Sequence, residues 1–155
     1  MKKFKYLQFL PSYFKKLEGR VYIAIVGGRD VDNFCFVESE FLNLVKEKKL
    51  ELSDIVIVSG GARGVDSFAR QIAEGFDLTL VEIIPDWDKY GKRAGFMRNK
   101  EIIKISDIVL AVPGPASKGT WHSIEVAKEM KKEVIIKVYR GEESISSLPI
   151  KKVRR

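Results

Sequence analysis

The 155-residue sequence predicts one Rossmann-like α/β domain, with a doubly wound, mostly parallel five-stranded sheet and helices on both faces. Short runs rich in β-branched residues alternate with longer stretches of helical spacing, as in successive βαβ units. The runs are almost continuously apolar, which is typical of strands buried on both faces. The length suits a single domain that buries its core without disulfides or a structural metal.

Five apolar runs are the expected strands, at 21–26, 55–58, 78–84, 108–112 and 134–139. Apolar residues between the first two runs recur at the spacing of a helix face, as in Phe34, Val37 and Phe41. The same spacing predicts a helix beginning at Val65, and further helices are expected near 93–105 and 120–132.

The domain is expected to span residues 21–140, between an N-terminal extension at 1–20 and a basic C-terminal tail at 141–155. The extension is rich in aromatic residues and is interpreted as an added helix or arm. We expect it to pack on the domain or on a second subunit of a homodimer or higher homo-oligomer. Binding to a membrane surface is the alternative.

The net charge of +7 is concentrated in the terminal segments. Residues 1–20 hold six Lys or Arg against Glu18 alone, residues 150–155 hold four, and the remainder carries −2. Basic termini are most often solvated and mobile, and nucleic-acid contact is the alternative.

Metal, disulfide and membrane chemistry are not indicated. The single Cys35 and the single His122 cannot supply the usual zinc ligand set, so no metal site is expected. Cys35 lies among apolar residues and is expected to pack in the core. No apolar run approaches the roughly 20 residues that cross a membrane, so a cytoplasmic protein without a membrane partner is expected.

Three glycine-rich segments follow expected strands. Ligands of open parallel sheets bind at the carboxyl ends of the strands, where the strand order reverses. Glycine accepts positive φ and lets backbone N–H groups approach a phosphate, and the helix that follows adds a favourable dipole. The three segments are Gly27-Gly28-Arg29-Asp30, Gly60-Gly61-Ala62-Arg63-Gly64-Val65-Asp66 and Pro113-Gly114-Pro115-Ala116-Ser117-Lys118-Gly119-Thr120.

A fourth segment, residues 85–99, contains both aromatic and basic residues. Trp87 or Tyr90 would stack on a base, although either ring would serve equally to pack a long loop. Arg98 falls in an expected helix that begins near the crevice, so its guanidinium is expected to reach the ligand.

The candidate ligand-binding residues combine backbone approach, cations, hydroxyls and rings. Arg29, Arg63, Arg98 and Lys118 would neutralise phosphate, and Thr120 would cap its helix and donate a hydroxyl. Asp30 and Asp66 would orient the arginines or hold ribose, with helix capping as the alternative. The full set is Gly27, Gly28, Arg29, Asp30, Gly60, Gly61, Arg63, Asp66, Trp87, Tyr90, Arg98, Asn99, Gly114, Ser117, Lys118, Gly119 and Thr120.

Common nucleotide fingerprints do not match. Residues 60–64 lack the dinucleotide glycine spacing, and Ser117-Lys118-Gly119-Thr120 inverts the Gly-Lys order of a P-loop. Neither NAD chemistry nor P-loop hydrolysis is supported, and no cofactor is expected.

These motifs, together with Asp86-Trp87, Tyr90-Gly91-Lys92, Ala94-Gly95 and Arg98-Asn99, resemble the Smf/DprA-LOG (SLOG) superfamily. The closest branch is the YspA-like one of bacteria and their phages, over about residues 21–139. The resemblance implies a Rossmann-like fold, often dimeric, with a nucleotide-type ligand in the crevice. The chain would sense or sequester that ligand, or process it.

LOG-type members cleave the N-glycosidic bond of nucleoside monophosphates with an arginine and a glutamate. Arg98 matches the arginine, and Gly119-Thr120 matches the end of the turn beside the glutamate, but His122 or Ser123 occupies the glutamate's place. Glu125, one helical turn later, is the nearest substitute acid, so Arg98 and Glu125 are the catalytic candidates. DprA-type members bind single-stranded DNA, which is the alternative function, and a purely structural interaction domain is a third option.

Overall fold

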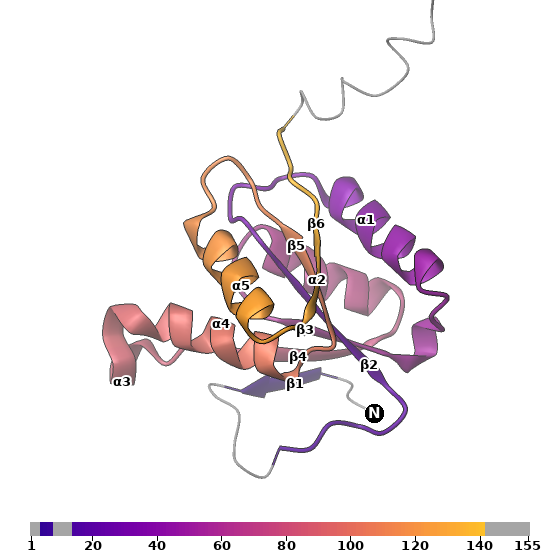
Figure 1. The fold of residues 1–155 in the computed structure, drawn as a ribbon, viewed down its shortest axis with the longest axis horizontal. Helices are drawn as coiled ribbons and strands as arrows, with labels where there is room; N and C mark the ends of the chain where they lie inside the picture. Colours follow the sequence, from indigo (N-terminus) through magenta and orange to yellow (C-terminus); the bar gives the residue numbers. More distant parts are fainter. Residues whose placement is uncertain (1–3, 8–13, 142–155) are drawn as a thin grey trace, which may run out of the picture.

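The computed structural model describes residues 4–7 and 14–141, and the backbone forms one six-stranded parallel sheet flanked by helices (Figure 1). The expectations for the other N-terminal residues and for the basic tail from residue 142 lie outside the described residues. The sheet order is β1-β4-β3-β2-β5-β6.

From β2 to β6 the chain alternates between strands and helical segments. The strands are β1 (Phe4–Leu7), β2 (Val21–Gly27), β3 (Ile55–Ser59), β4 (Thr79–Ile83), β5 (Ile108–Val112) and β6 (Glu133–Ile136). The helices are α1 (Phe34–Glu47), α2 (Val65–Gly75), α3 (Trp87–Tyr90), α4 (Ala94–Ile105) and α5 (Lys118–Glu129), with short 3-10 turns η1 (Leu52–Asp54) and η2 (Gly91–Arg93).

The strand order reverses between β2 and β5. From β2 the chain winds outward through β3 and β4, then returns to the other side of β2 with β5 and continues to β6. Val26 pairs with Ala111, so the carboxyl ends of β2 and β5 lie side by side. This is the topological switch point at which ligands of such sheets bind.

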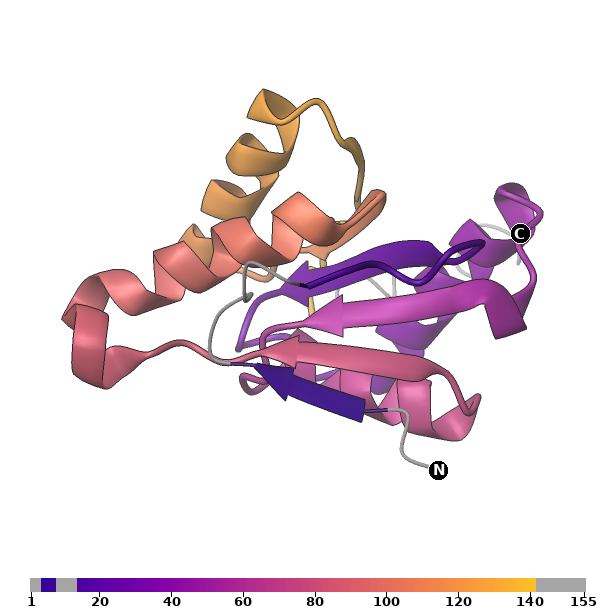
Figure 2. The ribbon, with the colours of Figure 1, turned by 90° about the horizontal axis from the view of Figure 1, so that it is seen from below.

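Helices cover both faces of the sheet, with α4 and α5 on one face and α1 and α2 on the other (Figure 2). Alternate residues of β2 serve the two layers: Ile23 and Ile25 join the α1 and α2 core, and Tyr22 and Ala24 join the α4 and α5 core. This period-2 alternation explains why the strand is apolar throughout.

The predicted fold class is confirmed, and all five expected strands are present. The sheet also has a sixth strand, because residues 4–7 of the extension form a strand rather than a helix and pair in parallel with β4. That pairing satisfies the backbone groups along one edge of β4. The expectation for Cys35 is wrong: the residue is exposed, because it lies off the buried stripe that Val37 and Phe41 define on α1.

Among the described residues, no helix is long and apolar enough to cross a membrane.

A side chain at Gly27 is expected to push apart the elements that meet at the end of β2. A Cβ atom there would lie 2.5 Å from the carbonyl oxygen of Val112 and would overlap the Val65 side chain. We expect Gly27→Ala to lower the free energy of unfolding by about 2–3 kcal/mol, measured by urea denaturation. Gly75→Ala, in α2 with nothing within 4 Å of the added atom, is the control and should be neutral or stabilising by up to about 1 kcal/mol.

Candidate functional site

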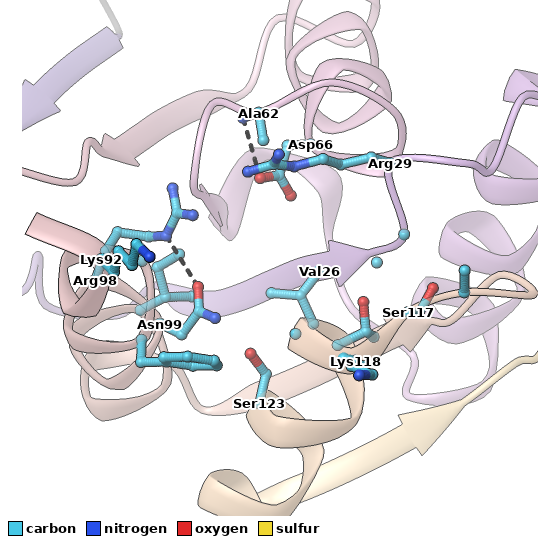
Figure 3. Close-up of a pocket in the computed structure, with 18 of the residues that line it drawn as sticks. Val26, Arg29, Ala62, Asp66, Lys92, Arg98, Asn99, Ser117, Lys118 and Ser123 are labelled. Carbon is cyan, nitrogen blue, oxygen red and sulfur yellow. Dashed lines mark hydrogen bonds between the residues drawn. The ribbon is translucent and has the colours of Figure 1, made fainter. Parts of the chain in front are cut away.

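A cavity of about 340 Å³ opens at the carboxyl ends of β2 and β5, at the switch point (Figure 3). The β2–α1 and β5–α5 loops, the start of α2 and one face of α4 surround it. The lining residues are Val26, Gly27, Gly28, Arg29, Ala62, Asp66, Trp87, Lys92, Gly95, Phe96, Arg98, Asn99, Ile102, Ala116, Ser117, Lys118, Gly119, Thr120 and Ser123.

Backbone hydrogen bonds join the three glycine-rich loops at Gly28. The Gly28 N–H donates to the carbonyl of Val112 at 3.1 Å, and the Gly28 carbonyl accepts from the Val65 N–H at 3.2 Å. Gly64 has a φ of +71°, and a Cβ atom at this position would lie 2.7 Å from the Cα of Arg29. Glycine is therefore required here both by backbone conformation and by the close approach of two loops.

Asp30 and Ser117 hold the β5–α5 loop in place. The Ala116 N–H donates to Asp30 Oδ2 at 2.8 Å, and the Gly114 N–H donates to Ser117 Oγ at 2.6 Å. Neither Asp30 nor Gly114 lines the cavity. The structure therefore places Asp30 as a support for the loop rather than beside an arginine of the cavity.

The amino terminus of α5 forms one end of the cavity. Lys118, Gly119 and Thr120, the first three helical residues, all line it. The Ser117 hydroxyl accepts from Gly114 and does not cap the helix, and Thr120 lies within the first turn rather than at the cap. The first-turn N–H groups and the helix dipole favour an anion at this end.

Arg98 lies beneath the Gly60 turn and is only 8% exposed. Its Nη1 donates to the carbonyl oxygen of Gly60 at 2.6 Å, and its Nε donates to Oδ1 of Asn99 at 2.9 Å. A Cβ atom at Gly60 would lie 2.5 Å from that Nη1, so the turn is closed by glycine. Burial lowers the pKa of Arg98, the negative charge of Asp66 opposes this shift, and Arg29 adds to it.

Asp66 is a carboxyl group in the buried face of α2, 9% exposed, and it also lines the cavity. Its Oδ2 accepts from the Ala62 N–H at 3.1 Å (Figure 3). Burial raises the pKa of Asp66 from 3.8 to about 6, an effect reinforced by the charge of Glu82. The Ala62 hydrogen bond and the charges of Arg98 and Arg29 partly offset that rise in pKa.

Two exposed rings, from α3 and α4, also line the cavity. Trp87 and Phe96 are 51% and 48% exposed. Trp87 lies along Gly95, where a Cβ atom would be 3.4 Å from the indole ring. Phe96 packs edge-to-face on His122, with ring centroids 4.6 Å apart. Exposed rings beside buried polar groups are suited to stacking on a planar ligand.

Besides Asp30 and Gly114, five of the predicted site residues do not line this cavity. Gly61 and Arg63 line a neighbouring cavity above the buried Glu82, whose oxygens accept from Arg70 at 2.6 and 3.1 Å. Tyr90 lines a third cavity along α4, and Glu125 is exposed on α5 and lines none of these three cavities. Gly60 lies behind Arg98 rather than at the cavity surface.

Sequence reasoning missed Lys92, Phe96 and Ser123, which line the cavity. Their spacing offered a signal: Phe96 and Asn99 are three residues apart on α4, and Thr120 and Ser123 are three residues apart on α5. The side chains of each pair lie on the same helix face, so the predicted residues Asn99 and Thr120 could have indicated Phe96 and Ser123.

Comparison with known families supports the resemblance stated above. Residues 21–90 match the model of the YspA, cpYpsA-related SLOG family. The chain is also 40% identical over 81 residues to the Gene 61 protein of Mycobacterium phage D29. That alignment covers 48% of this chain and 65% of the phage protein, less than two thirds of its length.

Two solved structures share the fold. DNA processing protein A from Helicobacter pylori, described with a single-stranded DNA binding mode, aligns with a TM-score of 0.58 and 19% identity, over 88% of this chain and 74% of its own. DNA processing protein A (DprA) from Streptococcus pneumoniae aligns with a TM-score of 0.61 and 19% identity, over 87% of this chain and 56% of its own. Both comparisons agree with the predicted fold class.

Ionised Asp66 is expected to lower the stability of the protein. The native protein holds the Asp66 proton up to a pH near 6, whereas an ordinary aspartate releases it near 3.8. Stability from this group is therefore greatest below about pH 4 and is lost as pH rises through 6. We expect Asp66→Asn to raise the free energy of unfolding at pH 8 by about 2–3 kcal/mol, and much less at pH 4, in urea titrations at both values.

Asp54→Asn removes the same formal charge at an exposed position and is the matched control. An equal gain for Asp66→Asn at pH 4 and pH 8 would contradict the assigned pKa of Asp66.

Proposed function

We propose, on the match of residues 21–90 to the YspA, cpYpsA-related SLOG family, that the cavity at the switch point binds a nucleotide or a nucleotide derivative. One observation carries the proposal: a single cavity is lined both by the amino terminus of α5 with nearby cations and by two exposed aromatic rings from α3 and α4. Its volume of about 340 Å³ falls within the range of small-molecule pockets.

The phosphate binds at the amino terminus of α5. The backbone N–H groups of the first turn are directed toward this end, and Gly28 and Gly119 add no side chain that would block the approach. Lys118 at the start of α5 and Arg29 in the β2–α1 loop supply positive charge. A phosphate dianion binds most strongly where such hydrogen-bond donors and positive charges converge.

The base stacks on the exposed rings of Trp87 and Phe96. Trp87 comes from α3 and Phe96 from α4, and both rings leave about half of their surface exposed. A planar base covers that apolar surface, and stacking on an aromatic side chain contributes about 1–3 kcal/mol per base. Asp66 and Asn99 also line the cavity and are suited to hold the ribose or the base edge.

The cavity favours a binding role, and Asp66 is the one acidic residue in its lining that could take part in hydrolysis. Glu125 is exposed outside the cavity, so its placement does not support the role that we assigned to it. Asp66 lines the cavity, and its pKa near 6 makes it a candidate proton carrier or ribosyl-cation stabiliser in N-glycosidic hydrolysis. Release of free base from a bound nucleoside monophosphate, abolished by Asp66→Asn, would establish the hydrolytic role over sequestration.

Single-stranded DNA is the second candidate ligand, and one feature of the surface favours it. Trp121 on α5 is 45% exposed and lies outside the cavity. Together with Trp87 and Phe96, it gives three exposed rings on the α3, α4 and α5 side of the domain. Successive rings of this kind stack successive bases of a strand. The proteins of similar fold include one described with a single-stranded DNA binding mode.

A lysine pair on α5 tests the phosphate end. Lys118 lines the cavity at the start of the helix, and Lys128 is exposed in its last turn. We expect nucleoside monophosphates to raise the melting temperature of the wild type, and Lys118→Ala to weaken their binding about fivefold to tenfold by calorimetry. Lys128→Ala makes the same charge change and should leave binding intact. Equal losses in the two variants would reject a phosphate at α5 in favour of a general charge effect.

Substitution of two tryptophans distinguishes a mononucleotide ligand from a single-stranded DNA ligand. We expect Trp87→Ala to weaken binding of a nucleoside monophosphate about tenfold or more, whereas Trp121→Ala leaves it unchanged, in calorimetric titrations of both. A twelve-nucleotide DNA strand is titrated in parallel at two salt concentrations. Binding of the strand that requires both tryptophans and weakens with salt would favour the single-stranded DNA function.

A further inference from the structure

The orientation of the Asn99 side-chain amide is fixed by Arg98. The Arg98 guanidinium carries only N–H donors, so the atom of Asn99 that faces Nε must be the oxygen, at 2.9 Å. Nε belongs to a side chain that is only 8% exposed and whose Nη1 is bonded to the Gly60 carbonyl. A rotated amide would set its NH₂ group against a buried N–H group and lose this bond.

The amide nitrogen of Asn99 therefore faces the cavity. Figure 3 shows that nitrogen on the side of Asn99 away from Arg98, directed toward the space between Val26 and Ser123. Among the described residues, no acceptor is hydrogen-bonded to it. The cavity thus presents an oriented donor at this position and no acceptor from the same side chain.

The position of this donor relates it to the base rather than to the phosphate. Asn99 lies one helical turn after Phe96 on α4, so the ring and the amide share a helix face. The phosphate end, at α5 and the β2–α1 loop, already has backbone N–H groups and lysine as donors. A base stacked on Phe96 brings its edge within reach of the Asn99 amide.

We propose that Asn99 selects nucleotides whose base presents a carbonyl oxygen, as uracil and hypoxanthine do, over those that present an amino group there, as cytosine and adenine do. This inference rests on the proposed nucleotide-binding function. Arg98 acts as the positioning residue, because it holds the amide so that a donor faces the base. An amino group at the same place would oppose donor to donor and leave both unsatisfied in a desolvated site.

The test uses two matched pairs of ligands, UMP against CMP and IMP against AMP, titrated calorimetrically into the full chain. Within each pair the two bases exchange a carbonyl for an amino group. We expect the wild type to bind the carbonyl member about tenfold more tightly. Asn99→Asp replaces the NH₂ donor by an acceptor while retaining the contact with Arg98, and it should reverse the preference within each pair.

Asn43→Asp, on the exposed side of α1, introduces the same charge away from the cavity and should keep the wild-type preference. Should Asn99→Asp fail to fold, Asn99→Ala removes the donor and should bring each pair to within about twofold. A wild type that binds both members of each pair equally overturns the role of Asn99 and leaves nucleotide binding standing. A wild type that binds none of the four nucleotides overturns both.

Discussion

The close packing at the carboxyl end of β2 is the constraint on which the site depends. Gly27 lies against the Val112 carbonyl of β5 and the Val65 side chain of α2 without room for a methyl group. Only that approach allows Gly28 to hydrogen-bond to both β5 and the start of α2. The ends of the strands and loops that meet here are therefore joined through backbone groups, and the side chains of Asp30 and Arg98 add hydrogen bonds to Ala116 and Gly60.

This backbone frame surrounds charged groups that the protein keeps in a poorly solvated place. Arg98 and Asp66 lie against the same side of Gly60, where a Cβ atom would be 2.5 Å from Nη1 of Arg98 and 2.9 Å from Oδ2 of Asp66. Each residue is less than a tenth exposed. Burial alone disfavours the charged form of both groups, and each favours the charge of the other. Replacing a buried ion pair by apolar residues of similar volume is often neutral or stabilising, and strongly shifted pKa values tend to cluster at functional sites.

The sequence was sufficient for the fold class and for the end of the sheet at which the glycine-rich loops meet, because both follow from backbone rules. Buried strands show as apolar runs, and the switch-point rule brings Gly27, Gly60 and Gly114 to one edge of the sheet. Side-chain direction does not follow from such rules. Arg63 and Tyr90 stand in the same motifs as Asp66 and Trp87, yet they line other cavities, because one step along a helix or loop rotates a side chain away. The sequence does contain a signal for Asp66, because this carboxylate falls on the apolar helix face with Ala69 and Ala73.

The edge strand β1 was not predicted, because four residues carry too little pattern, and its pairing has a kinetic consequence. Phe4 pairs with Leu80, so β1 pairs with a strand that comes almost half the chain length later in the sequence. No two neighbouring strands are connected by a hairpin, since every pair is parallel. Folding must close long loops before any strand pair forms, which slows it relative to a domain built from local contacts. During synthesis, β1 leaves the ribosome well before β4 and remains unpaired until β4 has emerged.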